Sequence, residues 1–204
     1  GARRSGPGGL SRDACARHRV GVLARRPGGQ GARVRRPSGI ARGRGIEVVA
    51  KPMENDGVSG MLLRFGNEFA IAYATHHENE GFENFSVAHE LGHYFLPGHA
   101  DAVITGDTGS HASRAGYSSS DKYEVEADRF AAGLLMPRHL FFPALERAGS
   151  GLSAIEKLKT LCMTSLHATA IRYTQCSRDP VAIIISRDSI IEHCFMSAAL
   201  KNVD

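Results

Sequence analysis

The sequence predicts an α+β domain in which a small β-sheet precedes a set of helices, with a β-hairpin near the C-terminal end. Residues 46–75 are rich in β-branched and aromatic residues around a tight turn, which is typical of strands. Apolar residues in 79–96 and 121–137 recur at intervals of three and four, which is typical of helices that pack on a core. Hydrophobic residues make up 42% of the 204 residues and charged residues 23%, so the chain can form one globular domain with an appendage.

The charge of the chain is divided unevenly along its length. Residues 1–44 contain twelve Arg and one acid, Asp13, and carry +11, so the remaining 160 residues carry −7, the difference from the total of +4. We expect 1–39 to be a disordered Arg- and Gly-rich arm, with order beginning near Ile40, because such a segment has too little apolar surface to pack. A basic arm can contact nucleic acid, but this one lacks aromatic residues for base stacking, so a solvated extension is the favoured interpretation.

The predicted sheet contains three strands before the first long helix. The segment IEVVA (46–50) is one strand. VSGMLLRF (58–65) and EFAIAYAT (68–75) form a hairpin, because strand-type residues flank the turn residues Gly66 and Asn67.

Helices follow, joined by one long loop. The first helix covers 79–96 and ends at Pro97 and Gly98, and we expect a loop over 98–121. The second begins after Asp121, whose side chain can cap it. Further helices are predicted over 138–149, 152–162 and 165–176, with a closing hairpin over 180–186 and 189–197.

The C-terminal part has the rhythm of helix, short turn and helix over 154–173. Such a pattern is found in DNA-reading units, but its apolar residues favour a packing surface instead. These residues are Leu158, Leu161, Leu166, Ala170 and Ile171. We therefore expect a core domain over 40–147, with 148–204 packed on it.

The segment FSVAHELGHYFLPGH (85–99) contains the pattern His-Glu-x-x-His. On a helix, His89 and His93 leave the same face one turn apart, at a spacing that allows both imidazoles to bind one Zn²⁺. Glu90 can then act as general base on a water that the metal activates. The neighbouring residues are apolar, and Gly92 allows another element to pack closely, so we favour a metal site over a chance match.

A catalytic zinc needs a third protein ligand, and His99 is one candidate. It stands six residues after His93, as in the pattern H-E-x-x-H-x-x-G-x-x-H. However, Leu96 occupies the position where that pattern has the glycine that turns the chain. His99 therefore fits the spacing but not the geometry.

The helix YEVEADRFAAGLLMP (123–137) offers another third ligand. Glu124 lies on the same face as Ala127 and Asp128, which is the buried face, whereas Glu126 is rotated about 200° from Glu124 and points away. A buried acid needs a partner, and a metal is a suitable one. Asp128 can accept a hydrogen bond from a ligating histidine.

The two motifs together resemble the ImmA/IrrE family of metallo-endopeptidases, which join HExxH to an E-x-E-A-[ND]-x-F-A-x-x-L-L-M-P helix. The resemblance covers residues 40–200 and stops before residue 40, where family members have an apolar helix. It implies a zincin-like fold, with His89, His93 and Glu124 as zinc ligands and Glu90 as base. Glu126 and His99 remain open as alternative ligands.

The resemblance also implies a protein substrate, often a DNA-binding repressor, and hydrolysis of one of its peptide bonds. A different class of function is a non-catalytic regulator or toxin–antitoxin partner on the same fold. A His/His/Glu site also accepts Mn²⁺ or Fe²⁺. Several side chains are candidates for stabilising an oxyanion, and nothing in the sequence chooses among Tyr94, His99, His111, Tyr117 and Tyr123.

The cellular compartment is indicated by the cysteines and the N-terminal residues. The four cysteines are widely spaced, with no C-x-x-C pair, and the basic N-terminal segment has no apolar signal region. No apolar run is long enough to span a bilayer. We therefore expect a cytoplasmic protein with no membrane partner.

Overall fold

We describe the protein from a computed structural model, in which residues 36–52, 57–104, 109–114 and 119–203 are described. These residues belong to one compact unit. The predicted disorder of the arm falls mainly on 1–35, outside the described residues. Helix α1 (Pro37–Arg42) begins before Ile40, the point where we expected order to start. Its first residue is Pro37, whose fixed φ suits the first helical position, and Ala41 is fully buried.

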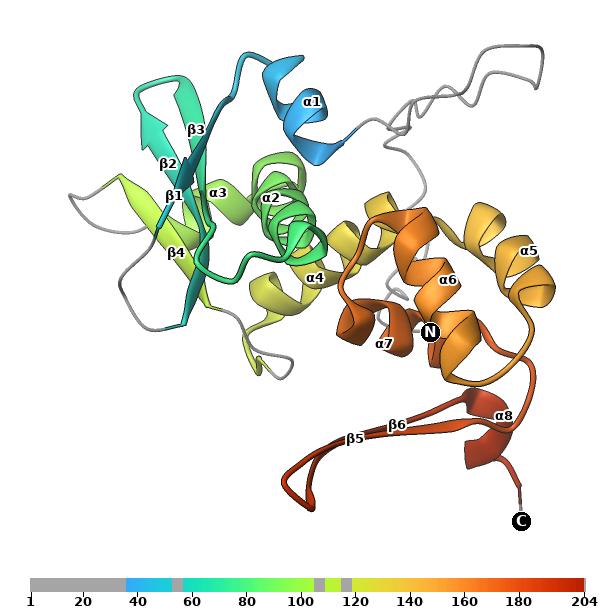
Figure 1. Ribbon diagram of the computed structural model, residues 1–204. Helices are drawn as coiled ribbons and strands as arrows, with labels where there is room; N and C mark the ends of the chain where they lie inside the picture. The colour runs from blue at the N-terminus through green and yellow to red at the C-terminus, as the bar shows by residue number, and fades with distance from the viewer. Residues whose placement is uncertain (1–35, 53–56, 105–108, 115–118, 204) are drawn as a thin grey trace, which may run out of the picture. The chain divides into compact units, whose positions relative to one another are not determined.

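A four-stranded sheet forms one side of this unit (Figure 1). The strand order is β1-β3-β2-β4; β1 pairs with β3 in parallel, and the other pairs are antiparallel. The predicted hairpin is confirmed, with Phe65 paired to Glu68 across the turn. The strands are β1 (Glu47–Lys51), β2 (Val58–Phe65), β3 (Glu68–Ala74) and β4 (Ser110–Arg114).

The prediction of a loop over 98–121 was wrong in two places. Residues His99–Val103 form the short helix α3, and Ser110–Arg114 form the edge strand β4. The sequence of β4, SHASR, contains none of the β-branched residues or of Phe, Tyr and Trp, which favour strands. Its strand conformation therefore depends on pairing with β2 rather than on local preference.

Helix α2 (Glu80–Phe95) lies against the sheet, and α4 (Lys122–Leu135) packs on α2 (Figure 1). Both helices begin with a side-chain cap. Asn79 accepts a hydrogen bond from the Phe82 N–H, and Asp121, the cap that we predicted, accepts one from the Tyr123 N–H. Between the sheet and α2 lies the first core cluster. Its buried members are Ala41, Ile46, Leu62, Ile71, Val87 and Leu91.

The C-terminal half forms a second core cluster. The helices are α5 (Arg138–Ala148), α6 (Leu152–Cys162) and α7 (Leu166–Cys176). Of the predicted packing surface, Leu158 and Ala170 belong to this cluster, as expected for a pattern that reflects packing, while Ile171 is half-buried and is not a member. Leu161 and Leu166 are exceptions, because both are exposed rather than part of the predicted packing surface.

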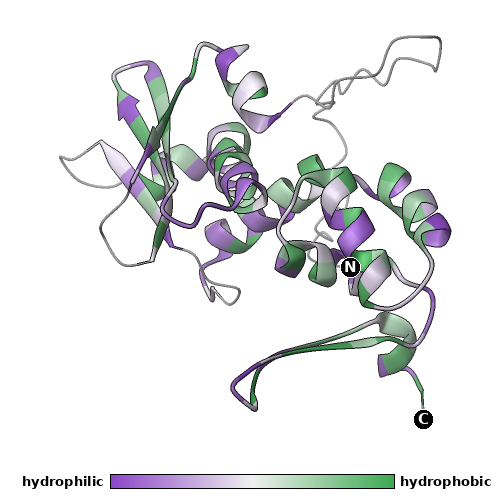
Figure 2. Cartoon of the chain, in the orientation of Figure 1, coloured by the Kyte–Doolittle hydropathy of each residue, from purple (hydrophilic) through white to green (hydrophobic). Residues whose placement is uncertain are grey.

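The chain closes with the predicted hairpin of β5 (Ala182–Arg187) and β6 (Ile190–Met196), followed by the short helix α8 (Ala198–Lys201). Both strands are hydrophobic along most of their length (Figure 2). Ile184, Ile190 and Ile191 are exposed. Among the described residues, no helix has the length and apolar character needed to span a bilayer.

Candidate metal centre

Helix α2 carries three of the predicted site residues. His89 and His93 are both buried, and Glu90 is fully excluded from solvent. The two histidines are one turn apart, so their rings leave the helix on one face, and their Nε2 atoms lie 3.1 Å apart. This is the arrangement that the HExxH spacing predicts.

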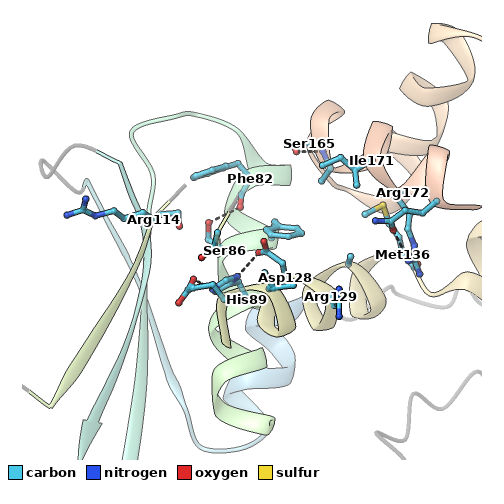
Figure 3. Close-up of a pocket in the computed structure, with 18 residues that line it drawn as sticks. Phe82, Ser86, His89, Arg114, Asp128, Arg129, Met136, Ser165, Ile171 and Arg172 are labelled. Atoms are coloured by element: carbon cyan, nitrogen blue, oxygen red, sulfur yellow. Dashed lines mark hydrogen bonds and ion pairs between the residues drawn. The ribbon is translucent and has the colours of Figure 1, made fainter. Parts of the chain in front are cut away.

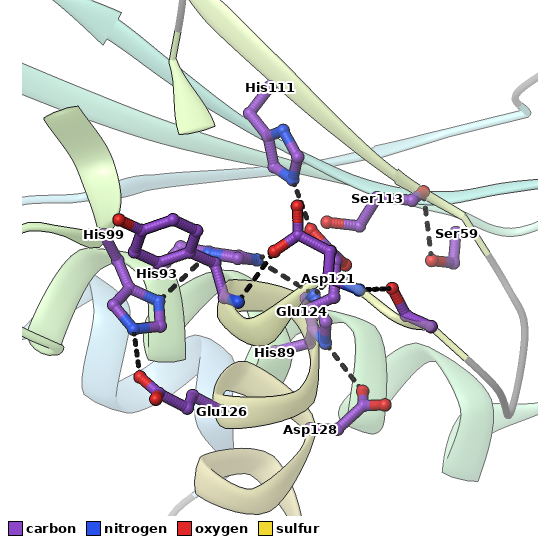
Figure 4. A network of polar contacts seen from close by, with 12 residues as sticks. Ser59, His89, His93, His99, His111, Ser113, Asp121, Glu124, Glu126 and Asp128 are labelled. Atoms are coloured by element: carbon purple, nitrogen blue, oxygen red, sulfur yellow. Dashed lines mark hydrogen bonds and ion pairs between the residues drawn. The ribbon is translucent and has the colours of Figure 1, made fainter. Parts of the chain in front are cut away.

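Helix α4 brings Glu124 to the two histidines (Figure 4). Glu124 Oε2 lies 3.1 Å from His89 Nε2, and Glu124 Oε1 lies 3.4 Å from His93 Nε2. The close approach of the helices depends on Gly92, where an added Cβ would lie 3.0 Å from the Cα of Ala127. The structure therefore brings Glu124 to the pair and confirms that Gly92 allows close packing.

The charges of these side chains are strongly coupled. Burial by itself would lower the pKa of His89, but hydrogen bonds to Asp128 and Glu124 outweigh it and raise this pKa to about 10. Burial would raise the pKa of Glu124, but hydrogen bonds from His111, His89 and His93 hold it well below its usual range. Burial lowers the pKa of His93, with the charge of His89 adding to the effect. An ionised carboxylate therefore faces two ring nitrogens, which suits a bound cation.

Asp128 holds the outer side of His89. The distance from His89 Nδ1 to Asp128 Oδ1 is 2.9 Å. With its Nδ1–H donated to Asp128, His89 can offer the lone pair of Nε2 to a metal ion that replaces the Nε2 proton, on the side where Glu124 and His93 lie. The contact that we predicted for Asp128 is present.

The two alternative third ligands do not join this cluster. His99 lies on the far side of His93, with the two Nδ1 atoms 3.4 Å apart. Glu126 contacts His99, at 3.0 Å from its Nε2, and is more than half exposed. As the sequence indicated, the chain does not turn at Leu96; it turns at Gly98, which has φ = +78°.

Glu90 sits under the edge of the sheet, beside β2 and β4. Neither of its carboxylate oxygens has a hydrogen-bond partner among the described residues, although both are buried. Burial raises the pKa of this carboxyl, while the charge of a protonated His89 and the nearby Ser113 hydroxyl oppose the shift. A buried acid without a partner is costly unless water or a substrate supplies one.

Sequence reasoning missed the role of Gly60 in β2. A Cβ at this position would lie 2.7 Å from Glu90 Oε1. The strand therefore needs a glycine where the carboxylate of Glu90 approaches. The signal in the sequence was a glycine inside a predicted strand, which often marks close contact with another group.

Among the candidates for stabilising an oxyanion, His111 approaches the cluster most directly. Its Nε2 lies 2.9 Å from Glu124 Oε1, and it comes from the edge strand β4. Tyr123 packs edge-on against His99, and Tyr94 packs edge-on against Phe69. Tyr117 lies outside the described residues.

A pocket of about 320 Å³ opens beside the cluster, between α2, α4 and α7 (Figure 3). His89 and Glu124 contribute to its wall. Phe82 faces it from α2 and Ile171 from α7. Its other apolar lining residues are Phe85, Val125, Ala132, Met136 and Ala168.

The donor set fits a divalent cation such as zinc. One ligand atom each from His89, His93 and Glu124 lies within 4.8 Å of the other two. Two imidazole nitrogens and one carboxylate oxygen form a known three-ligand set for catalytic zinc, which leaves the fourth position open. The unpartnered carboxylate of Glu90 lies beside this set, as a general base for water requires.

The fold and the site together define a protein of the zincin-like metallopeptidase class, in which HExxH on one helix meets a glutamate from a second. The family model of the IrrE N-terminal-like domain, a peptidase family, matches residues 41–174. Because this is about two thirds of the chain, the chain belongs to that family, in agreement with the resemblance seen in its motifs. The match ends before the β5–β6 hairpin. None of the curated proteins compared with the chain matched it.

Proposed function

We propose that this chain is a zinc-dependent endopeptidase that hydrolyses a peptide bond in a regulatory protein, such as a DNA-binding repressor. The observation that carries the proposal is the buried, unpartnered Glu90 carboxylate beside the His89–His93–Glu124 cluster. A purely structural metal site has no use for such a base. The choice of a repressor is supported by the family resemblance alone.

Each site residue has one role in the proposed reaction. A zinc ion held by His89, His93 and Glu124 would polarise the scissile carbonyl and lower the pKa of water. Glu90 accepts a proton from the attacking water and delivers it to the leaving amine. Burial raises the pKa of Glu90, which makes its carboxylate a better proton acceptor in the first step.

The edge of the sheet and the pocket provide places for the substrate. Strand β4 lies at the end of the strand order, so an extended peptide can pair with its outer edge. We assign to His111 on this strand the hydrogen bond to the developing oxyanion, and the position of its Nε2, 2.9 Å from the proposed ligand atom Glu124 Oε1, supports this role. The apolar pocket next to His89 accepts one substrate side chain, and its lining favours a large hydrophobic one.

The test of the function uses Glu90→Gln together with metal analysis of the purified full chain. Wild type should contain about one zinc per chain. Glu90→Gln should keep this zinc and lose at least about 100-fold in peptide hydrolysis, because the general base is removed while the ligands remain. Glu124→Ala should lose the zinc, whereas Glu126→Ala and His99→Ala should still bind it.

A non-catalytic regulator or toxin–antitoxin partner on this fold predicts different results. Its partner binding would survive both Glu90→Gln and removal of metal with a chelator. Wild-type protein that neither contains zinc nor takes it up would contradict the enzyme proposal. Loss of zinc in His99→Ala with retention in Glu124→Ala would instead contradict the assignment of the third ligand.

A further inference from the structure

Behind the ligand His93 lies a line of contacts that the proposed reaction does not use. His99 Nδ1 is 3.4 Å from His93 Nδ1, and His99 Nε2 is 3.0 Å from Glu126 Oε2 (Figure 4). His99 is 2% exposed, so water does not compete freely for its nitrogens. The three side chains therefore form a chain that runs from the metal cluster to the protein surface at Glu126.

The direction of each hydrogen bond follows from the role of His93. If Nε2 of His93 faces a metal, the proton of the neutral ring must be on Nδ1. That N–H then donates to His99 Nδ1, which must be the unprotonated nitrogen. The proton of His99 is consequently on Nε2, where the Glu126 carboxylate accepts it. Every donor in this chain meets an acceptor, so the arrangement is self-consistent only in this one direction.

The other proposed ligand, His89, is also hydrogen-bonded at Nδ1, but directly to a carboxylate. His89 donates from Nδ1 directly to the Asp128 carboxylate. We propose that His99 and Glu126 are positioning residues for the metal site. His99 accepts a hydrogen bond from His93 and donates one to the Glu126 carboxylate, whereas Asp128 accepts a hydrogen bond from His89 directly. This inference rests on the proposed zinc site and adds to it how the ring of His93 is oriented.

The local structure holds His99 in this place. It is the first residue of α3, which follows the left-handed turn at Gly98. Tyr123 packs edge-on against its ring, with the centroids 5.0 Å apart. Asp101 on the same short helix pairs with Arg64 of β2 at 2.6 Å. The turn at Gly98 and these two contacts, one with α4 and one with β2, therefore fix the position of α3 and of the His99 ring on it.

The spacing of the acids on α4 explains why one helix can serve three histidines. Glu124 and Asp128 are four residues apart, so they share the face that meets His89. Glu126 is rotated away from that face, and α3 places His99 on its side instead. The motif Glu-x-Glu-x-Asp thus supplies one carboxylate to the ligand cluster, one to His99 and one to His89.

The inference is tested by the zinc dissociation constant, measured by competition with a chelator on the full chain. His99→Phe keeps a ring of similar size but removes both nitrogens, and we expect it to weaken zinc binding by about 10- to 100-fold. Glu126→Leu should weaken binding by a smaller factor, and Glu126→Gln by less still, since the amide retains an acceptor oxygen. His139→Phe, at an exposed position on α5, is the matched control and should leave the constant unchanged.

The double variant His99→Phe/Glu126→Leu separates a connected chain from two independent effects. If Glu126 acts through His99, the double variant binds zinc no more weakly than His99→Phe alone. The inference would be overturned if the double variant showed the product of the two single losses in zinc affinity. An unchanged zinc dissociation constant in His99→Phe would overturn it as well. Complete loss of zinc in His99→Phe, as in Glu124→Ala, would make His99 a ligand and also overturn it. Should His99→Phe fail to fold, the comparison of Glu126→Leu with Glu126→Gln decides alone, because Glu126 is exposed.

Failure of the inference can be distinguished from failure of the proposed function. If wild type binds no zinc, both the proposed function and the inference are contradicted. Suppose instead that wild type binds about one zinc per chain and that Glu124→Ala loses it. A wild-type dissociation constant in His99→Phe would then contradict only the role of His99 and Glu126.

Discussion

Gly60 fixes where the carboxylate of Glu90 can lie. The strand passes so close that a methyl group would sit 2.7 Å from Oε1 and 3.2 Å from Cγ of Glu90. Both atoms belong to a flexible side chain, so the strand itself need not move when a methyl group is added. The cost of a substitution here therefore falls on the geometry of the base rather than on the fold.

We expect Gly60→Ala to keep its zinc and its stability but to lose about 10- to 100-fold in kcat/KM, because a displacement of the base by about 1 Å is enough for such a loss. The measurement is peptide hydrolysis by protein with verified metal content. Gly133→Ala is the control, since Gly133 lies in α4 with nothing within 4 Å of an added Cβ. A variant at Gly60 with wild-type kcat/KM would contradict this role.

At the scale of elements, the site depends on how closely α4 approaches α2. Ala127 is fully buried where the helices meet, and Gly92 faces its Cα and carbonyl oxygen. The ligand Glu124 is on α4, while His89 and His93 are on α2. Any change in the separation of the helices therefore changes the distances within the ligand cluster.

We expect Ala127→Leu to lower the free energy of unfolding by about 1–3 kcal/mol, because three more carbons must enter a packed interface. It should also weaken zinc binding by moving Glu124 away from the histidines. Urea unfolding and chelator competition measure the two effects. Gly133→Leu adds a leucine to the same helix at an open position and should show neither, so equal effects in both variants would sink this explanation.

The elements that could be predicted from the sequence are those with strong local signals. The hairpin of β2 and β3 has turn residues between β-formers, and α4 has both its cap Asp121 and its buried stripe. The edge strand β4 and helix α3 could not be predicted, because their conformation is set by contacts with β2 and by the turn at Gly98.

The candidate site divides in the same way. The helical period puts His89 and His93 on one face of α2 and Glu124 on the buried face of α4, and these placements could be predicted from spacing. That the two faces meet in one ligand set was implied by the family resemblance. The contact of Glu126 with His99 could not, because it depends on where the short helix α3 lies in space. Likewise, the need for glycine at position 60 becomes visible only when β2 and α2 are packed together.

At the scale of the whole described region, the start of α2 contacts the C-terminal helices near the pocket. The start of α2 lies against the turn between α6 and α7: an added Cβ at Gly81 would lie 2.2 Å from the carbonyl carbon of Thr164. Asn84 donates a hydrogen bond to the Met163 carbonyl at 3.0 Å. This contact holds α7, with Ile171, across the pocket from α2.

We expect Gly81→Ala to destabilise the protein by about 1–3 kcal/mol or more, because the methyl group meets backbone atoms that cannot rotate away. The displaced α7 should also change the width of the pocket and hence the preferred substrate side chain, while the ligands on α2 and α4 keep their zinc. Urea unfolding, metal content and hydrolysis of peptides that differ at one hydrophobic position measure the three effects. Gly39→Ala in α1, which has open space around it, is the control. If Gly81→Ala lost zinc together with its peptide preference, the disturbance would have reached the turns of α2 that carry His89 and His93, and the expectation that the metal site is unaffected would be wrong.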